Sequence, residues 1–201
     1  MDLKRVIGII HKIRFACIID GCNRAEYIRK HNLFASMGSN CMFQSRHFPM
    51  DPKMVKIHDN VSVAADVIFC THDAIRHVFQ NYDNNDYVPH MGCIEIDDNV
   101  FVGLGSIIMP NVYIGKNSII AAGSLVLRDV PSGSIVGGHP AKIIGSFDDL
   151  HKKRVEEGRK LAVLSHEELE FFYWQEFYKS HYHINREQSR DKTSFTEGRC
   201  E

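Results

Sequence analysis

The sequence predicts a mainly β protein whose central part is a solenoid of triangular coils, with helices flanking it on both sides. The first observation behind this expectation is an aliphatic or aromatic residue that recurs every six positions. These positions are Ile57, Val63, Phe69, Ile96, Val102, Ile108, Ile114, Ile120 and Val126. The second observation is that small or acidic residues often follow directly, as at Asp97, Gly103, Gly115 and Ala121, and that Ser106, Ser118 and Ser124 recur shortly after.

A six-residue period fits neither an α-helix, which shows three-four spacing, nor a simple strand, which alternates. If each hexapeptide forms one short strand and a corner, three hexapeptides close a triangular coil of 18 residues. The apolar residue then points into the shaft, and small residues permit the tight corners. The expected coils span residues 57–74, 96–113 and 114–131, with a weaker start at 37–42 and a looser excursion over 44–56.

Polar and aromatic residues interrupt the period from about residue 73 to residue 94. We expect this segment to leave the shaft as a loop, and long loops in compact folds are commonly functional. Helical periodicity is expected over residues 23–30, 147–164 and 167–178. The expected organisation is an N-terminal helical segment (1–34), a β-helix domain (35–145, with the loop 73–94), C-terminal helices (146–182) and a disordered tail (183–201).

Composition excludes several classes of function. The 201 residues carry a formal net charge of −1, which gives no basic face for nucleic acid. The six cysteines are widely scattered and no signal peptide opens the chain, so we expect reduced thiols and a cytoplasmic protein. The apolar stretch 6–19 contains His11, Lys12 and Arg14 and is too short and too charged to span a bilayer. A helix packed on a neighbouring subunit and a peripheral membrane contact both remain open for it.

The segment Ile94–Ile144 resembles the hexapeptide-repeat acyltransferases, which include maltose, galactoside and capsular-polysaccharide O-acetyltransferases. The resemblance is carried by residues 96–103 (IDDNVFVG), 120–131 (IAAGSLVLRDVP) and 136–144 (VGGHPAKII). It extends more weakly back to about Ala25. It implies a left-handed β-helix, acetyl-CoA as co-substrate without a metal, a homotrimer, and a sugar hydroxyl as acceptor.

Acyl transfer from a thioester to a hydroxyl needs a base for the hydroxyl proton and donors for the oxyanion. Histidine suits the first task because its ordinary pKa lies near neutrality. The family places its catalytic histidine where the chain leaves the shaft, and the matching segment here is Thr71-His72-Asp73. His77 is the competing base. Asp73 is expected to orient the imidazole, to bind a sugar hydroxyl, or simply to cap the loop.

The resemblance also implies binding positions for the thioester and for acetyl-CoA. Backbone N–H groups near small residues would meet the thioester oxygen, although solenoid corners require small residues in any case. These positions are Gly103, Leu104, Ala122 and Gly123. The pantetheine arm would run beside Leu127 and Arg128, with Lys142 near the nucleotide phosphates.

Two positions depart from the family pattern. Phe101 stands where many relatives have tryptophan, and His139 stands where asparagine is commoner. Phe101 can pack beside the acceptor, but its ring donates no hydrogen bond, which leaves the acceptor open.

Three alternatives remain at the level of sequence. The first is an N-acetyltransferase of an amino-sugar nucleotide, or an antibiotic acetyltransferase. The second is a γ-carbonic-anhydrase-like protein with zinc on three histidines, for which His72, His77 and a strained His58 are the candidates. The third is a non-catalytic scaffold.

Overall fold

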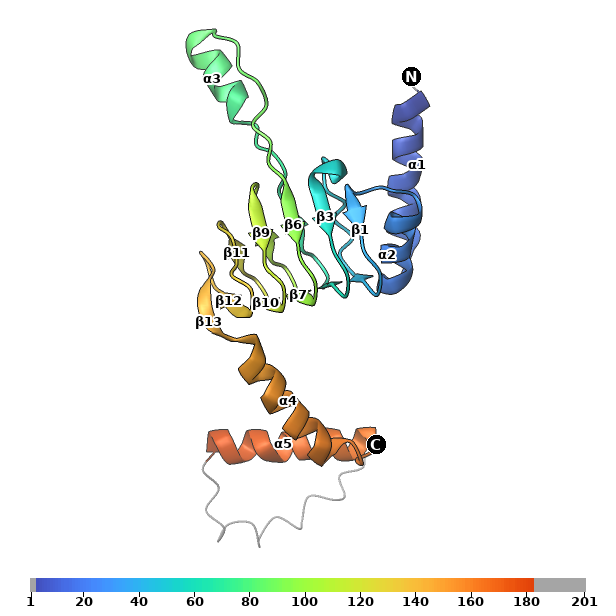
Figure 1. The fold of residues 1–201 in the computed structure, drawn as a ribbon, viewed down its shortest axis with the longest axis vertical. Helices are drawn as coiled ribbons and strands as arrows, with labels where there is room; N and C mark the ends of the chain where they lie inside the picture. The colour runs from blue at the N-terminus through green and yellow to red at the C-terminus, as the bar shows by residue number, and fades with distance from the viewer. Residues whose placement is uncertain (1–2, 183–201) are drawn as a thin grey trace, which may run out of the picture. The chain divides into compact units, whose positions relative to one another are not determined.

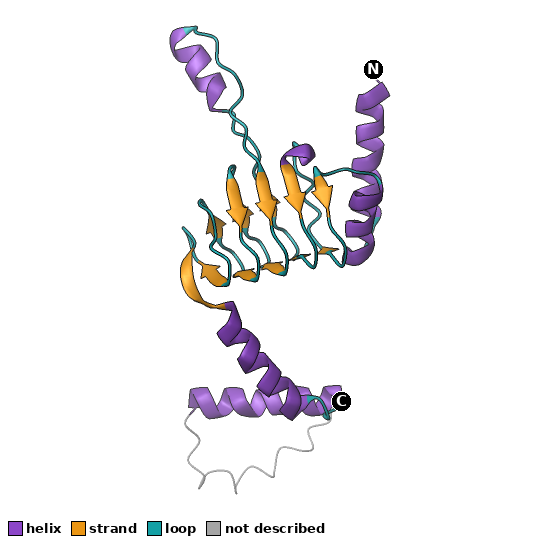
Figure 2. Cartoon of the chain, viewed as in Figure 1, coloured by secondary structure: helices purple, strands orange, loops and turns teal. Residues whose placement is uncertain are grey.

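The computed structural model describes residues 3–182, so the expected disordered tail at 183–201 lies outside the described residues. The chain divides into two compact units, with the boundary after His151. The first unit contains short parallel strands in three sheets, two helices before them and one helix inserted among them (Figures 1 and 2).

Three sheets form the faces of a coil in the first unit. Sheet A contains β1 (Ser36–Met37), β3 (Val55–Ile57), β6 (Ile94–Ile96) and β9 (Val112–Ile114), which Figure 1 shows side by side. Sheet B contains β2 (Met42–Phe43), β4 (Ser62–Val63), β7 (Val100–Val102), β10 (Ser118–Ile120), β12 (Ser134–Gly137) and the antiparallel β13 (Lys142–Ser146). Sheet C contains β5 (Ile68–Phe69), β8 (Ile107–Ile108) and β11 (Leu125–Val126). From β3 to β11, the chain visits sheets A, B and C in turn.

The strand register has the expected step of one coil. Ile96 pairs with Ile114, Val102 with Ile120, and Ile108 with Val126, each 18 residues apart. All nine aliphatic or aromatic positions of the six-residue period are buried, with at most 5% of their surface exposed. The period therefore does mark the core of the coil, as predicted.

Asparagine occupies the corner after sheet A, where small residues were expected. Asn60, Asn99 and Asn117 adopt φ values of 54–58°, a left-handed conformation that asparagine tolerates. Their side chains form a ladder, with Asn60 donating to Asn99 (2.8 Å) and Asn99 donating to Asn117 (2.9 Å). The recurring Ser106, Ser118 and Ser124 do not form these left-handed turns, because they are buried, and their hydroxyls bond to backbone carbonyls.

Helices α1 (Leu3–Cys17) and α2 (Gly21–Lys30) cover the first coil. Phe15 of α1 is buried and packs edge-on against Phe43, with ring centroids 5.9 Å apart. Arg24 of α2 is 1% exposed, and its guanidinium donates to the carbonyls of Phe43 and Gln44. A solenoid end exposes apolar side chains and unpaired strand edges, so this cap stabilises the first coil.

The sequence predicts a loop for the inserted segment between β5 and β6. The structure differs, because this segment contains helix α3 (Ile75–Asp83). Its apolar residues at 75, 78, 79 and 82 follow helical spacing, a signal that the neighbouring polar residues concealed. A second, shorter irregularity precedes β3, where the 3-10 helix η1 (Pro52–Met54) follows Asp51.

Helix α4 (Phe147–Leu161) begins in the first unit, and α5 (His166–Tyr182) belongs to the second. The expected helices at 147–164 and 167–178 therefore differ from these only at their ends. Across the described residues, no helix combines the length and the apolarity that a bilayer crossing requires.

Candidate active site

The corner between sheet C and sheet A is where the solenoid departs from its regular step. The chain leaves β5 at this corner, forms the insertion and returns to β6. The two ends of the insertion are paired, because the Gly92 N–H donates to the Thr71 carbonyl (2.9 Å) and His72 forms an antiparallel bridge with Met91. His72 thus lies at the exit from the shaft, where the sequence places it.

Asp51 lies against His72 at this corner. The Nδ1 atom of His72 is 2.5 Å from Oδ2 of Asp51, and the Thr71 hydroxyl donates to the same oxygen at 3.0 Å. Both paired side chains are about one third exposed, at 32% and 29%. A carboxylate only accepts, so this contact holds the hydrogen of a neutral imidazole on Nδ1 and leaves Nε2 with its lone pair. This is the tautomer that a general base needs.

Sequence reasoning missed Asp51 and left open the residue that orients His72. The available signal was a change in the number of residues between paired positions of neighbouring coils. The first coil advances 20 residues between Met42 and Ser62 instead of 18, and the two extra residues lengthen the corner that contains Asp51. Asp51 also precedes Pro52, which marks a turn in the chain.

A hollow of about 260 Å³ lies beside this pair, and Asp51, His72, Asp73, Arg76 and His77 are among its lining residues. The carboxylate of Asp73 accepts the N–H of Ile75 at 2.9 Å, which is the loop-capping role. The guanidinium of Arg76 forms no hydrogen bond or ion pair with any residue of the described chain. The hollow thus offers two histidines and a cation that is unpaired among the described residues.

The three positions expected to hold acetyl-CoA lie together. Leu127, Arg128 and Lys142 line a cleft of about 540 Å³ with Val130 and Ile143. The cleft begins after β11 at the same corner of the coil, because Phe69 aligns with Ile108 and Ile108 with Val126. Neighbouring strands lie about 4.8 Å apart, so two coils separate the exit of the insertion from this cleft by roughly 10 Å.

The expected thioester-binding residues lie at a different corner, between sheets B and C. The N–H of Gly103 donates to Ile120 (2.8 Å) and that of Gly123 donates to Leu104 (2.7 Å), so neither is free to hold an oxyanion. The N–H groups of Leu104 and Ala122 donate to no other described residue. Both residues are exposed, so two of the four positions combine an exposed residue with an unpaired backbone N–H group.

Phe101 is exposed on β7 of sheet B, paired with Ser62 and Ile119. It does not line the hollow beside His72. His139 is exposed after β12. One chain therefore does not bring Phe101, Leu104 and Ala122 to His72.

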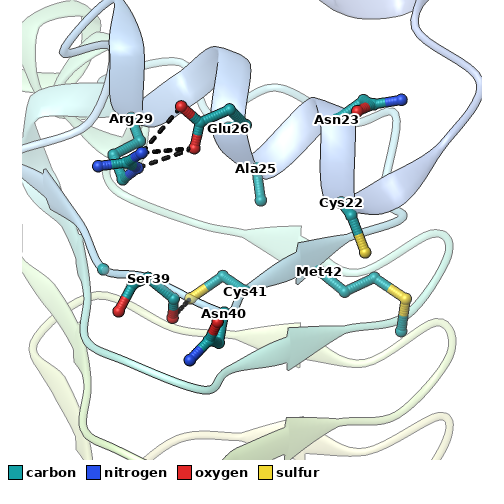
Figure 3. A pocket seen from close by; sticks show the side chains of 10 residues that line it. Cys22, Asn23, Ala25, Glu26, Arg29, Ser39, Asn40, Cys41 and Met42 are labelled. Carbon is teal, nitrogen blue, oxygen red and sulfur yellow. Dashed lines mark hydrogen bonds and ion pairs between the residues drawn. The ribbon is translucent and has the colours of Figure 1, made fainter.

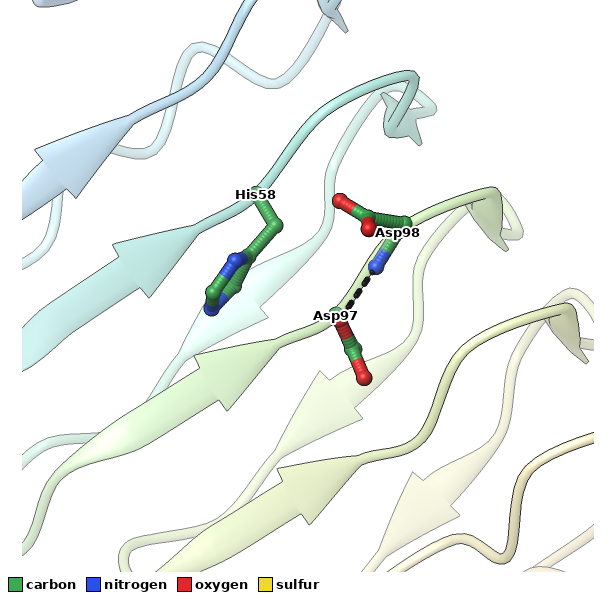
Figure 4. A group of neighbouring side chains, drawn as sticks. All are labelled: His58, Asp97 and Asp98. Carbon is green, nitrogen blue, oxygen red and sulfur yellow. Dashed lines mark hydrogen bonds between the residues drawn. The ribbon is translucent and has the colours of Figure 1, made fainter.

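A possible cation cluster lies elsewhere, at the corner after sheet A (Figure 4). Ligand atoms of His58, Asp97 and Asp98 lie within 4.8 Å of one another. Glu95 is the partner of His58 Nε2 (2.7 Å), and hydrogen bonds from Lys56 and then His58 hold the pKa of Glu95 below its ordinary value.

Internal partners also occupy the two aspartates of this cluster. Tyr113 donates to Asp97 at 2.7 Å, and the Asp59 N–H donates to Asp98 at 3.0 Å. Among the described residues, His58, His72 and His77 form no shared ligand group, so the three-histidine zinc site is not assembled within this chain.

A hollow of about 520 Å³ between α2 and the first coil is twice as large as the one beside His72 (Figure 3). Its lining contains no histidine. The Cys41 thiol in its wall is buried, and burial raises the pKa of that thiol, which disfavours the reactive thiolate. Size alone therefore does not select the hollow that contains the histidine candidates.

Comparison with known proteins agrees with the coil geometry. A family model described as bacterial transferase hexapeptide (six repeats) matches residues 93–128. Protein CapG of Staphylococcus aureus is 33% identical over 160 residues, which cover 78% of this chain and 91% of CapG. A galactoside O-acetyltransferase of Lactococcus lactis is 40% identical over 70 residues, 35% of this chain and 34% of that protein.

One relative matches over a short stretch. A tetrahydropyridine-dicarboxylate N-acetyltransferase of Clostridium perfringens is 50% identical over 64 residues, which span 32% of this chain and 27% of that protein. Among solved structures, a galactoside acetyltransferase in complex with coenzyme A aligns with a TM-score of 0.55 at 23% identity, covering 74% of this chain and 83% of its own. A maltose O-acetyltransferase of Clostridium difficile aligns with a TM-score of 0.52 at 25% identity, covering 68% and 82%. These structures share the fold.

Proposed function

We propose that this chain, which belongs to the hexapeptide-repeat acetyltransferases, moves the acetyl group of acetyl-CoA onto a sugar hydroxyl with His72 as the general base. One observation carries the proposal. His72 is paired with Asp51 at the mouth of a hollow, and the cleft of Leu127, Arg128 and Lys142 begins two coils away along the same corner.

The chemistry follows from the tautomer of His72. Nε2 accepts the proton of the acceptor hydroxyl while the oxygen of that hydroxyl attacks the thioester carbonyl carbon. The resulting tetrahedral oxyanion needs N–H donors. It then collapses, the carbon–sulfur bond breaks, and the imidazolium returns its proton to the departing CoA thiolate. Asp51 stabilises the imidazolium in the interval because its carboxylate lies on Nδ1.

The cleft suits the two ends of acetyl-CoA. Leu127 and Ile143, which are both exposed, offer apolar surface to the pantetheine arm. Arg128 and Lys142 offer cations to the phosphates, for which a flexible ammonium and a guanidinium are both suitable. We also propose that the coil is left-handed, as in the family, and that the β-helix domain spans residues 35–145.

The site is completed by a second copy in a homotrimer. The N–H groups of Leu104 and Ala122 are unpaired at the corner between sheets B and C, whereas His72 lies at the corner between sheets C and A. In a three-fold assembly of parallel solenoids, one copy can bring the first corner to the second corner of its neighbour. Phe101, exposed on sheet B, would then reach the acceptor from the neighbouring copy.

The sugar acceptor follows the relatives named for galactoside and maltose acetylation, and a role in polysaccharide synthesis extends the same proposal. N-acetylation is the second candidate, because the Clostridium perfringens N-acetyltransferase is 50% identical over the 64 residues that it matches. All five described cysteines are unpaired, which supports a reducing compartment such as the cytoplasm. Cys200 lies outside the described residues.

The test is thiol release from acetyl-CoA across a panel of neutral sugars, uronic acids, nucleotide sugars and amino sugars. The His72→Asn variant should lower kcat about 100- to 10,000-fold, the usual contribution of a general base. Binding of acetyl-CoA, measured by calorimetry, should remain.

His77→Asn is the matched control, because this histidine lines the same hollow without touching Asp51. If His77→Asn abolishes turnover and His72→Asn does not, His77 is the base. If amines react and hydroxyls do not, N-acetylation replaces the sugar-ester proposal.

A further inference from the structure

Helix α1 has two different faces. The inner face packs on the first coil through Phe15, which is 1% exposed, and His11 hydrogen-bonds the Tyr27 hydroxyl through Nδ1 at 2.8 Å. The outer face presents three isoleucines to solvent: Ile9, Ile10 and Ile13 are 44%, 43% and 60% exposed. At 3.6 residues a turn, these three lie within an arc of about 100°. We call them the isoleucine stripe.

Cations border the stripe on both sides. By the same helical geometry, Lys12 lies about 60° beyond one edge and Arg14 about 40° beyond the other. Both are exposed. The α1 segment has four lysines and arginines and no aspartate or glutamate, although the whole chain has a net charge of −1. Two of these cations thus border an apolar face that the described residues of the first unit leave exposed.

We propose that α1 docks flat on an anionic membrane surface. The isoleucine stripe enters the boundary between headgroups and acyl chains, and Lys12 and Arg14 contact lipid phosphates. A helix with an apolar face and a cationic border has the properties of an interfacial helix. Negative surface potential then adds to the burial of the isoleucines.

A second copy of this chain fits the stripe less well. Two α1 helices packed stripe to stripe would bring Lys12 and Arg14 of one copy close to the same residues of the other. No carboxylate on α1 offsets that repulsion. An anionic surface satisfies both the stripe and its border.

The experiment is co-sedimentation of the full chain with vesicles of phosphatidylcholine alone and of phosphatidylcholine with phosphatidylglycerol. The partition coefficient should be at least about tenfold larger with the anionic lipid and should fall as salt rises, because salt screens the attraction. The double variant Ile9→Asp/Ile13→Asp should lose at least about tenfold of this binding. Lys12→Gln/Arg14→Gln should lose several fold, and its two exposed positions leave the packed face intact.

Two matched controls use the same substitutions elsewhere. Ile19→Asp changes an isoleucine that is 85% exposed outside the helix, and Lys152→Gln/Lys160→Gln removes two exposed cations of α4. Both should bind as wild type does. Equal binding to both vesicle types overturns the proposal, as does unchanged binding by the isoleucine and cation variants. A smaller assembly of Ile9→Asp/Ile13→Asp by light scattering, with no vesicle binding by wild type, assigns the stripe to a second copy instead.

Discussion

The regular coils from β6 to β11 and the corner that contains Asp51 and His72 follow different rules. In the regular coils every residue has its counterpart 18 positions away, and the inward residues are buried aliphatics. At the corner the step becomes 20 and then 39 residues, and half-buried polar groups meet. Repetition therefore encodes the scaffold, and the two departures from repetition bring Asp51 and His72 together.

The largest expected effect on stability lies in the regular part. Ile114 is fully buried, and Ile114→Ala should cost about 2–5 kcal/mol of unfolding free energy through lost contacts and a cavity. Urea unfolding measures this cost, and turnover per folded molecule should not change. Ile68→Ala, on the outward side of β5, should cost less than half as much. Equal costs would contradict the separation of an inward column from outward positions.

The corner should show the reverse behaviour. In Asp51→Asn, the amide can donate to Nδ1 and so favour the tautomer that carries its hydrogen on Nε2, which is unable to accept a proton. We expect kcat to fall about 10- to 100-fold, with KM for acetyl-CoA and the urea midpoint unchanged. Asp66→Asn, at an exposed left-handed turn that asparagine tolerates, is the control. A collapse of stability with Asp51→Asn would make this contact part of the scaffold.

Two glycines sharpen the comparison between coil and helix. A Cβ on Gly103 would lie 2.5 Å from the backbone nitrogen of Ala122 in the next coil, so Gly103→Ala should cost about 1–3 kcal/mol. Gly158 in α4 has open space around it, and Gly158→Ala should gain about 0.5–1 kcal/mol. Thermal unfolding of both variants checks the opposite signs. A harmless Gly103→Ala would mean that the coils stack less closely than described.

The smallest effect should appear in the dependence of the melting temperature on acidic pH. Hydrogen bonds from Lys56 and His58 lower the pKa of Glu95 in the folded chain. A lowered pKa contributes stability above the unfolded value of about 4.3, and this contribution is lost as the pH falls through the lower folded pKa. The difference in melting temperature between wild type and Glu95→Gln should therefore shrink from pH ~7 to pH ~3. Glu156→Gln, on the exposed side of α4, should show no such trend.

The sequence predicted those features that repeat or that lie where repetition stops. The buried column from Ile57 to Val126 follows from its period, and His72 lies at the exit where the period breaks. Asp51 was not predicted as a site residue, because its contact with His72 spans 21 positions and depends on how two unequal corners stack. The role of His72 as the base stays a prediction. So do the roles of the expected binding residues.

The paired ends of the insertion have a consequence for diversification. Hydrogen bonds from Asp73 to His90 and from Gly92 to Thr71 bring the two ends together, and the register beyond resumes its step of 18. Doubling the length of a closed loop costs only about 0.6 kcal/mol of folding free energy, so the enclosed segment tolerates changes of length. The residues between Asp73 and His90 can therefore be exchanged without changing the register of the coil beneath them.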